Sequence, residues 1–272
     1  MNSGYNDAPI GVFDSGVGGL TVAREILKQY PNESIVYFGD TARVPYGSKS
    51  KDTIIKFSRQ IVRFLKAQNV KAIVVACNTA SAFALDVIEK EIDIPIIGVV
   101  KPGAKVAAQT TENKKVGIIG TEATVRSELY TKYIKSIDGA ITVFGKACPL
   151  FVPLVEEGML NDSVTDEMAR RYLEVLKEVG VDSLILGCTH YPLLRDTIGK
   201  VMGDGVRLVN PAYETARSLG FLMEEHNIKA SSNHKATYDF YVSDGAQKFK
   251  NFANSILPLN IEWIDEINIE SY

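Results

Sequence analysis

Cysteine is scarce in this sequence: among its 272 residues only Cys77, Cys148 and Cys188 are cysteines. The number is odd, the three lie far apart, and no two form a Cys-x-x-Cys pair. This pattern disfavours both a disulfide framework and a zinc ribbon. We therefore expect reduced thiols and no bound metal.

Long hydrophobic runs and an excess of one charge are also missing. No apolar run approaches the ~20 residues of a membrane span, and the first residues, MNSGYNDAPIGVF, lack the charged and apolar segments of a signal peptide. The formal charge is only -3, with lysine and arginine spread along the chain. We expect a cytoplasmic protein that binds neither nucleic acid nor a membrane, so an anionic ligand must be held by local groups.

The sequence does contain alternating strand and helix patterns. Short β-branched runs predict buried strands at 10–13, 35–38, 72–76, 94–100, 116–120, 140–144, 183–186 and 206–209. Helical spacing predicts helices at 51–68 and 163–179, the second capped by Ser163 together with Asp166. Such alternation is typical of an α/β fold.

An internal repeat divides the chain into two halves. Cys77 ends the run Val70-x-x-Ile73-Val74-Val75-Ala76-Cys77, and Cys188, 111 residues later, ends the matching run Val181-x-x-Leu184-Ile185-Leu186-Gly187-Cys188. Residues 10–15 match 116–121, and the strand ends before Pro102 and Pro211 match as well. Three matches in the same order predict two pseudo-symmetric parallel-sheet α/β domains with the active site in the cleft between them.

The repeat also predicts where these domains begin and end. We expect 1–98 plus 211–272 to form the first domain and 99–210 to form the second. Ligands of parallel sheets bind at the carboxyl ends of the strands. Cys77 and Cys188 are therefore expected to converge on the cleft from opposite sides.

Each of these two cysteines precedes side chains that can donate hydrogen bonds to a carboxylate, in Cys77-Asn78-Thr79 and Cys188-Thr189-His190. A small core residue is the alternative for either cysteine alone, but two matched occurrences favour function. A thiol tuned from its ordinary pKa of ~8.5 suits acid–base catalysis. Two opposed thiols suit inversion of an amino-acid α-carbon, where one removes a proton and the other returns one. Cys148 and Trp263 are expected to serve packing.

A glycine-rich segment follows the first predicted strand and opens a helix, in Asp14-Ser15-Gly16-Val17-Gly18-Gly19. Its backbone N–H groups can approach an anion such as a carboxylate. Nucleotide binding is disfavoured, because Thr21 stands where a dinucleotide fingerprint needs its third glycine and no Gly-Lys-Ser/Thr follows. Two alternatives stay open: Asp14 as a helix N-cap, and Glu156 as a solvated turn residue.

Five motifs together carry a resemblance to a known family. They are the glycine-rich segment, Gly39-Asp40-Thr41-Ala42-Arg43-Val44-Pro45-Tyr46-Gly47, Cys77-Asn78-Thr79-Ala80, Pro153-Leu154-Val155-Glu156, and Gly187-Cys188-Thr189-His190-Tyr191-Pro192. Over nearly its whole length the chain resembles the cofactor-independent glutamate racemases of the aspartate/glutamate racemase superfamily. The resemblance implies interconversion of L- and D-glutamate without cofactor or metal, supplying D-glutamate for bacterial peptidoglycan.

The resemblance also implies roles for individual residues. Cys77 would take the proton from D-glutamate with Asp14 assisting, and Cys188 from L-glutamate with His190 and Glu156 assisting. The implied substrate contacts are Asp14, Ser15, Tyr46, Gly47, Asn78, Thr79, Thr189 and His190, with Thr121 and Thr124 as further candidates. Glutamate is the expected small-molecule partner, and a homodimer is one oligomeric state that the sequence leaves open.

Two other functions compete with this hypothesis. Aspartate racemases of the same superfamily usually have a Glu residue at the position of His190. The histidine in this sequence therefore favours glutamate over aspartate as the substrate. The other alternative is a non-enzymatic anion-binding module, in which both cysteines are core residues.

Overall fold

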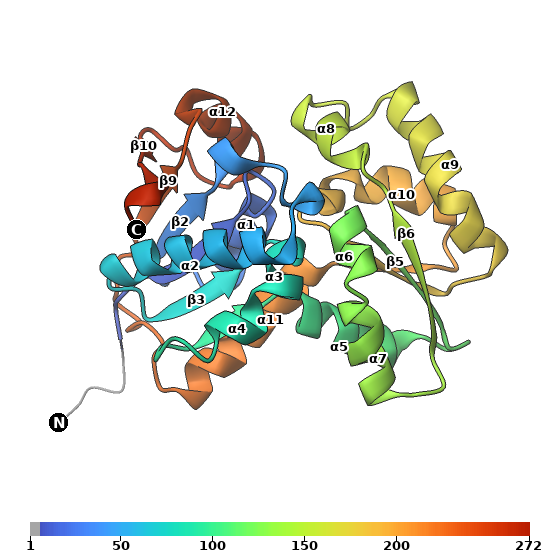
Figure 1. The fold of residues 1–272 in the computed structure, drawn as a ribbon, viewed down its shortest axis with the longest axis horizontal. Helices are drawn as coiled ribbons and strands as arrows, with labels where there is room; N and C mark the ends of the chain where they lie inside the picture. Colours follow the sequence, from blue (N-terminus) through green and yellow to red (C-terminus); the bar gives the residue numbers. More distant parts are fainter. Residues whose placement is uncertain (1–5) are drawn as a thin grey trace.

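The protein folds as two parallel β-sheets, each with helices packed against it (Figure 1). A computed structural model describes residues 6–272; residues 1–5, which belong to the predicted first domain and to the segment compared with a signal peptide, lie outside the described residues. Within 6–272, one sheet has the order β10-β9-β2-β1-β3-β4 and the other β6-β5-β7-β8. Every pairing in both sheets is parallel.

The elements of the two sheets come from different parts of the chain. The first sheet contains β1 (Ile10–Asp14), β2 (Ile35–Gly39), β3 (Ala72–Val75), β4 (Ile96–Gly98), β9 (Tyr238–Val242) and β10 (Asp265–Glu266), and the second contains β5 (Lys115–Gly120), β6 (Thr142–Ala147), β7 (Ser183–Gly187) and β8 (Arg207–Val209). The order β2-β1-β3-β4 recurs as β6-β5-β7-β8. This recurrence confirms the predicted α/β fold of two related parallel sheets.

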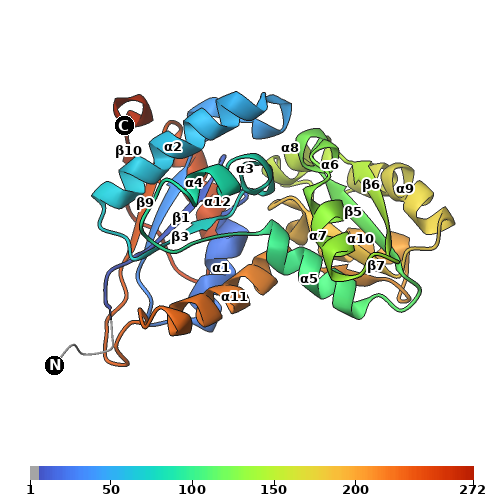
Figure 2. The same ribbon diagram turned by 60° about the horizontal axis from the view of Figure 1, so that its bottom comes forward.

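Helices cover both faces of the sheets. In chain order they are α1 (Leu20–Gln29), α2 (Lys51–Ala67), α3 (Asn78–Phe83), α4 (Leu85–Ile88), α5 (Val100–Thr110), α6 (Glu122–Arg126), α7 (Leu129–Ile137), α8 (Phe151–Glu156), α9 (Ser163–Glu178), α10 (Arg195–Met202), α11 (Pro211–Glu225) and α12 (Ala246–Ile256), with short 3-10 turns at Thr41–Arg43, Tyr46–Ser48, Tyr191–Leu194 and Ile269–Ser271. Figure 2 shows α2 on one side of the first sheet and α1 with α11 on the other. Strands covered on both faces are continuously apolar, which explains the runs seen in the sequence.

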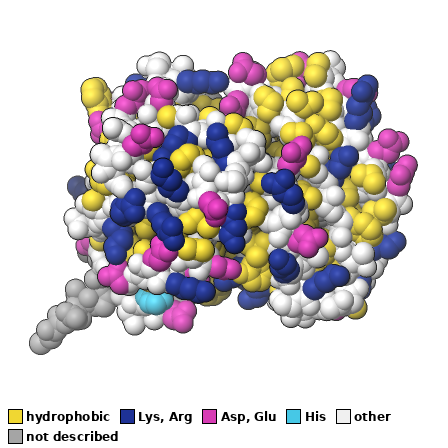
Figure 3. Space-filling view, viewed as in Figure 1, with side chains coloured by type: hydrophobic (Ala, Val, Ile, Leu, Met, Phe, Trp, Pro, Cys, Tyr) yellow, Lys and Arg dark blue, Asp and Glu magenta, His cyan; other side chains and the backbone are white. Residues whose placement is uncertain are grey.

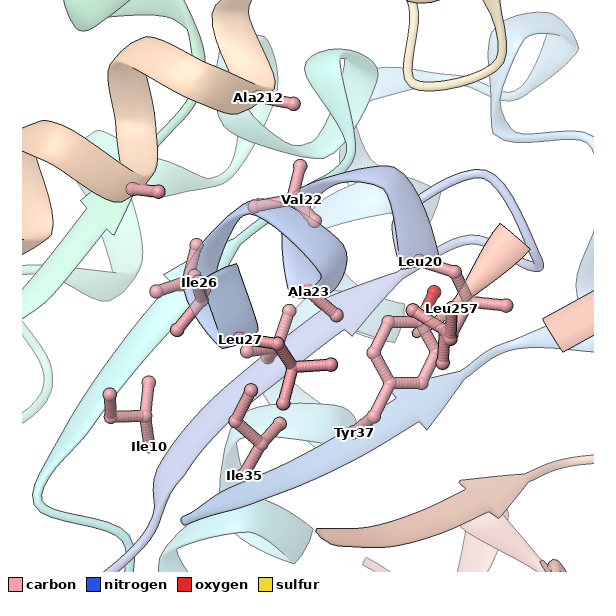
Figure 4. Packing of buried hydrophobic residues seen from close by; sticks show 14 of the residues in the cluster. Ile10, Leu20, Val22, Ala23, Ile26, Leu27, Ile35, Tyr37, Ala212 and Leu257 are labelled. Carbon is pink, nitrogen blue, oxygen red and sulfur yellow. The ribbon is translucent and has the colours of Figure 1, made fainter. Parts of the chain in front are cut away.

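The alternation of side chains along β1 divides the core of the first half. Ile10 and Val12 face the α1 side, while Phe13 faces the opposite, α2 side. Figure 4 shows Ile26 and Leu27 of α1 packed near Ile10 on the first of these sides. The core thus fixes α1, and with it the glycine-rich turn that leads into this helix.

Several local predictions were wrong. The strand predicted at 94–100 is only Ile96–Gly98, because α5 already begins at Val100. Helix α9 begins at Ser163 as predicted, but its N-cap is Asp162, whose side chain accepts the N–H of Val164. Trp263 is 77% exposed and does not serve packing.

The chain passes between the two halves where β4 leads into α5 and where β8 leads into α11. α11 packs against both α1 and α5, so it contacts both halves. We keep the limits 1–98 plus 211–272 and 99–210 as our proposal for the two domains.

The surface mixes both charges. On the face shown in Figure 3, acidic and basic side chains are interspersed rather than gathered by sign. None of the helices within residues 6–272 is both long enough and apolar enough to cross a membrane.

Candidate active site

A pocket of about 410 Å³ opens between the two halves, and both cysteines line it. Its lining residues are Ser15, Gly16, Val44, Pro45, Tyr46, Gly47, Ser48, Cys77, Asn78, Thr79, Thr121, Glu122, Pro149, Val152, Pro153, Glu156, Cys188, Thr189 and His190. The volume lies in the usual range for small-molecule sites. Of the residues that the sequence predicted to be catalytic or to contact the substrate, all within the described range, Asp14 and Thr124 do not line it.

Cys77 lies just beyond β3, where it caps helix α3. Its Sγ accepts the backbone N–H of Ala80 at 3.5 Å, and its thiol donates to Oγ of Ser15 at 3.6 Å. Burial raises the pKa of Cys77 to about 12, and the negative charge of Asp14 adds to this effect. Cys77 is therefore a neutral thiol at neutral pH.

Cys188 follows β7 directly and has a different partner. Its Sγ lies 3.7 Å from Nδ1 of His190, and Nε2 of the same ring lies 3.1 Å from Oε1 of Glu156. Burial lowers the pKa of His190, but the hydrogen bonds to Cys188 and Glu156 outweigh it and raise this pKa to about 10. The imidazole is thus a cation between a sulfur atom and a carboxylate.

Glu156 ends α8 at the rim of the pocket. Its hydrogen bond with His190 lowers the pKa of the carboxyl group, so Glu156 is ionised at neutral pH. The contact with His190 contradicts the alternative in which Glu156 is only a solvated turn residue. Neighbouring Glu157, in contrast, is exposed and lies 3.6 Å from Nζ of Lys248.

Asp14 lies behind the pocket wall, at the end of β1, and is fully buried. Its carboxylate accepts the N–H of Gly16 at 3.0 Å and that of Gly19, and Thr189 Oγ1 donates to it at 3.4 Å. Burial nevertheless raises the pKa of Asp14. The carboxylate held by the glycine-rich turn is thus that of Asp14 itself, whereas the sequence predicted a ligand there.

The same geometry excludes Asp14 as a helix N-cap. The N-cap of α1 is Gly19, which makes no side-chain capping bond. A Cβ atom at Gly19 would collide with Asp14 Cβ and would lie 2.8 Å from the hydroxyl of Tyr37. Gly19 is therefore required by the close approach of the turn to Asp14.

Gly18 provides a close contact between the two halves. A Cβ atom at Gly18 would collide with Oγ1 of Thr189 and would lie 2.5 Å from Nδ1 of His190. The turn after β1 therefore packs directly against the segment that follows Cys188.

The loop from Asp40 to Gly47 forms one wall of the pocket. Buried Asp40 accepts Nε of Arg43 at 2.8 Å, the hydroxyl of Ser243 at 3.0 Å and the hydroxyl of Tyr46. Since Asp40 takes the Tyr46 hydroxyl, the ring and backbone of Tyr46 remain to line the pocket. Asp40 lies in a motif quoted from the sequence, but its anchoring role depends on Ser243, which is about 200 residues away.

Three hydroxyl groups meet across the interface. Thr79 Oγ1 lies 3.0 Å from Thr121 Oγ1 and 3.1 Å from Thr124 Oγ1. Thr121 also caps α6. Gly47 fits against this group, since a Cβ atom there would lie 2.9 Å from Cβ of Thr121.

Part of the pocket lining was not predicted from the sequence. Val44, Pro45 and Pro153 lie inside the quoted motifs without having been proposed as contacts, and Ser48, Glu122, Pro149 and Val152 lie outside them. Pro149 follows β6, whose carboxyl end lies beside that of β5, so the parallel-sheet rule could have found it. Cys148 is buried in the core and does not line the pocket.

No lysine or arginine of residues 6–272 lines the pocket, so an anionic ligand there would depend on hydroxyl, amide, backbone N–H and imidazole groups. In the same range, no cluster of three or more His, Cys, Asp or Glu side chains is placed to hold a metal ion.

The sequence matches the family described as Asp/Glu/Hydantoin racemase over residues 10–219. It is 46% identical to a glutamate racemase of Geobacter metallireducens over 96% of this chain and 97% of that protein. A glutamate racemase of Lactococcus lactis subsp. cremoris is 45% identical over 98% of both chains.

Solved structures agree with the sequence matches. A glutamate racemase isoform from Bacillus anthracis has a TM-score of 0.93 and 39% identity, covering 97% of this chain and 98% of that one. A glutamate racemase from Francisella tularensis, solved in complex with D-glutamate, has a TM-score of 0.91 and 37% identity, with 98% and 99% covered. An aspartate racemase from Picrophilus torridus is 18% identical with a TM-score of 0.55, covering 84% of this chain and 98% of that one, and shows a shared fold.

Two parallel α/β halves that close on one pocket, together with these matches, define the class: the protein is an isomerase of the racemase type. The chain belongs to the Asp/Glu/hydantoin racemase family. This identification as an enzyme contradicts the alternative of a non-enzymatic anion-binding module.

Proposed function

We propose that this protein is a glutamate racemase in which Cys188 and Cys77 act as opposed bases without a cofactor. The observation that carries the proposal is that two thiols with different acid–base partners line one pocket. The names of the full-length relatives support glutamate as the substrate. The proposed role is to supply D-glutamate for peptidoglycan in the cytoplasm, as the resemblance implies.

The two thiols have different surroundings. The sulfur of Cys188 lies 3.7 Å from Nδ1 of His190, a ring whose pKa is raised to about 10. Cys77 keeps its proton because burial and the Asp14 charge raise its pKa. We therefore assign Cys188 as the base for L-glutamate and Cys77 as the acid.

In the forward direction, the Cys188 thiolate takes the α-proton of L-glutamate. An S–H bond forms as the Cα–H bond breaks, and the electron pair left on Cα spreads into the adjacent carboxylate. The Cys77 thiol then gives its proton to the opposite face, which forms D-glutamate and leaves a thiolate at Cys77. D-glutamate reacts by the same steps in reverse, so each thiol serves as acid in one direction and base in the other.

Neutral donors would stabilise the charge that develops on the substrate carboxylate. Asn78, Thr79 and Thr189 line the pocket beside the two sulfur atoms. Fixed donors aimed at developing charge stabilise the transition state more than the ground state. In this proposal Asp14 acts on Cys77 through its charge, since it lies behind the pocket wall.

The experiment is to incubate the purified protein, free of added cofactor, with L-glutamate in deuterated water. Optical rotation follows inversion, and proton NMR follows exchange at the α-carbon. We expect the rotation to decay to zero while deuterium enters the α-position. Absence of both between about pH 6 and pH 9, a range that brackets a tuned thiol, would refute the proposal.

Parallel incubations with L-aspartate test the substrate. We expect glutamate to be turned over far faster, because the full-length relatives at 45–46% identity are named glutamate racemases, whereas the aspartate racemase at 18% identity shares only the fold. Faster turnover of aspartate would replace the substrate while leaving the racemase chemistry in place. Absorbance of a pyridoxal-type cofactor in active protein would overturn the cofactor-free mechanism.

A further inference from the structure

The buried hydroxyl of Tyr130 reaches from the second half of the molecule to a pocket residue of the first. Tyr130 lies near the start of α7, and its hydroxyl donates to Oδ1 of Asn78 at 2.7 Å. Among residues 6–272, Nδ2 of Asn78 has no protein acceptor. The tyrosine therefore holds the amide with its oxygen away from the pocket and its NH₂ group available to a ligand.

A second hydroxyl makes the reciprocal contact. Thr21, in α1 of the first half, donates through Oγ1 to the backbone oxygen of Thr189 at 2.9 Å. The same oxygen atom of Thr21 lies 3.0 Å from the carbonyl of Gly18, which already accepts the N–H of Thr21. Thr21 thus fixes the peptide that joins Thr189 to His190.

The two contacts are related by the internal repeat. Asn78 and Thr189 each follow a cysteine, and Thr21 and Tyr130 lie 109 residues apart on helices that join the first and second strands of their sheets. Each half therefore holds the residue after the cysteine of the other half. We propose that Tyr130 and Thr21 are positioning residues for the racemase reaction: Tyr130 orients the Asn78 amide toward the substrate carboxylate, and Thr21 fixes the turn that carries His190.

The ring and the hydroxyl of Tyr130 have separable roles. The ring packs between α5 and β7, since Cβ atoms at Gly103 and Gly187 would each lie 3.5 Å from it. Tyr130→Phe keeps this packing and removes only the donor to Asn78. In the same way, Thr21→Val keeps the shape of the side chain and removes the hydroxyl, whereas Thr21→Ser keeps the hydroxyl.

This inference rests on the proposed function, and steady-state kinetics test the two separately. We expect Tyr130→Phe to lower kcat/KM for both enantiomers about tenfold, because an Asn78 amide that is no longer held in place loses about one hydrogen bond to the substrate carboxylate. We expect Thr21→Val to lower kcat about tenfold with little change in KM, and Thr21→Ser to restore it. Tyr133→Phe, on the same helix α7 but outside the pocket lining, should behave as wild type.

A double-mutant cycle separates positioning from general stability. If Tyr130 acts through Asn78, then Tyr130→Phe has no further effect on kcat/KM in an Asn78→Ala background. An additive effect would overturn the positioning role of Tyr130, and so would a wild-type kcat/KM in the single variant. Thr21→Ala repeats the test if Thr21→Val does not fold, and wild-type kcat in either variant would overturn the role of Thr21.

The wild-type protein serves as the reference for the underlying activity. An inactive wild-type protein would refute the proposed function itself, whereas an active wild type with unaffected variants refutes only the inference. Because L- and D-glutamate are equally stable, kcat/KM must be equal in the two directions for every variant. Measuring both directions therefore checks each data set internally.

Discussion

Oε1 of Glu156 lies 3.1 Å from Nε2 of His190, and the other nitrogen of this ring lies 3.7 Å from the sulfur of Cys188. The three residues come from the end of α8 and from the segment after β7, both in the second half. A carboxylate that accepts from an imidazole favours the charged ring. In the proposed mechanism, Glu156 therefore acts on Cys188 through His190.

Substitution of Glu156 tests this relay. Glu156→Gln removes the negative charge, so the pKa of His190 should fall from about 10 and less of the ring should be cationic at high pH. We expect kcat from L- to D-glutamate to fall about tenfold, the size expected for one charge-assisted hydrogen bond. The alkaline limb of the pH profile of kcat should move to lower pH.

Glu157→Gln is the matched control, because Glu157 is adjacent, exposed and lies 3.6 Å from Nζ of Lys248. It should keep the wild-type profile. An unshifted alkaline limb in Glu156→Gln would show that Glu156 does not set the charge of His190.

Isotope exchange tests which cysteine serves which enantiomer. In Cys77→Ala, Cys188 can still remove the α-proton of L-glutamate and return deuterium to the same face. We expect exchange of L-glutamate without inversion, and no exchange of D-glutamate. Cys188→Ala should show the reverse pattern. Optical rotation and NMR in deuterated water measure inversion and exchange in both variants. Full racemisation by either variant would contradict the two-base assignment.

The pKa of Cys77 predicts a loss of stability at high pH. Its pKa is raised from 9.0 to about 12, so the unfolded chain releases this proton above about pH 9 while the folded protein retains it. The folded state then binds more protons than the unfolded state, and the free energy of unfolding falls as pH rises. The slope reaches about 1.4 kcal/mol per pH unit between the two pKa values.

Urea unfolding at pH 8, 9 and 10 measures this slope. Cys77→Ser should show a shallower pH dependence than wild type. Cys148→Ala provides a comparison, since burial also raises the pKa of Cys148 to about 12. We expect Cys148→Ala to reduce the pH dependence of the unfolding free energy by a similar amount while the variant still turns over glutamate. Equal slopes in wild type and Cys77→Ser would contradict the raised pKa.

The sequence was sufficient for the sheets and for the pair Cys77 and Cys188, because both depend on local patterns that recur in register. It was insufficient for β9 and β10. β9 mixes aromatic residues with Asp239, and β10 is an edge strand of only Asp265 and Glu266. In β9 only Phe240 and Val242 are buried, so the strand lacks a continuously buried run. β10 carries no hydrophobic residue at all, and edge strands often carry charges.

Contacts across the interface between the two halves could not be predicted from the sequence either. The roles of Thr21 and Tyr130 depend on which residues face them from the other half, and spacing along the chain does not encode this. The sequence likewise indicated an anion near the glycine-rich turn but not that Asp14 itself would provide it. A buried carboxylate is defined by the tertiary structure that surrounds it.

The close contact at Gly18 leads to the last prediction. A methyl group there would collide with Thr189 Oγ1 and would lie 2.5 Å from His190 Nδ1, so Gly18→Ala must displace these residues or separate the two halves. A displacement of this kind at a catalytic group costs about 100-fold in rate, and we expect kcat/KM to fall by about this factor. Gly205→Ala is the control, because no heavy atom of residues 6–272 beyond its chain neighbours lies within 4 Å of the position that the new methyl group would take. Racemisation assays should show wild-type activity for Gly205→Ala, and thermal unfolding should show that both variants fold. Wild-type activity in Gly18→Ala would mean that the halves can separate at this contact without loss of catalysis.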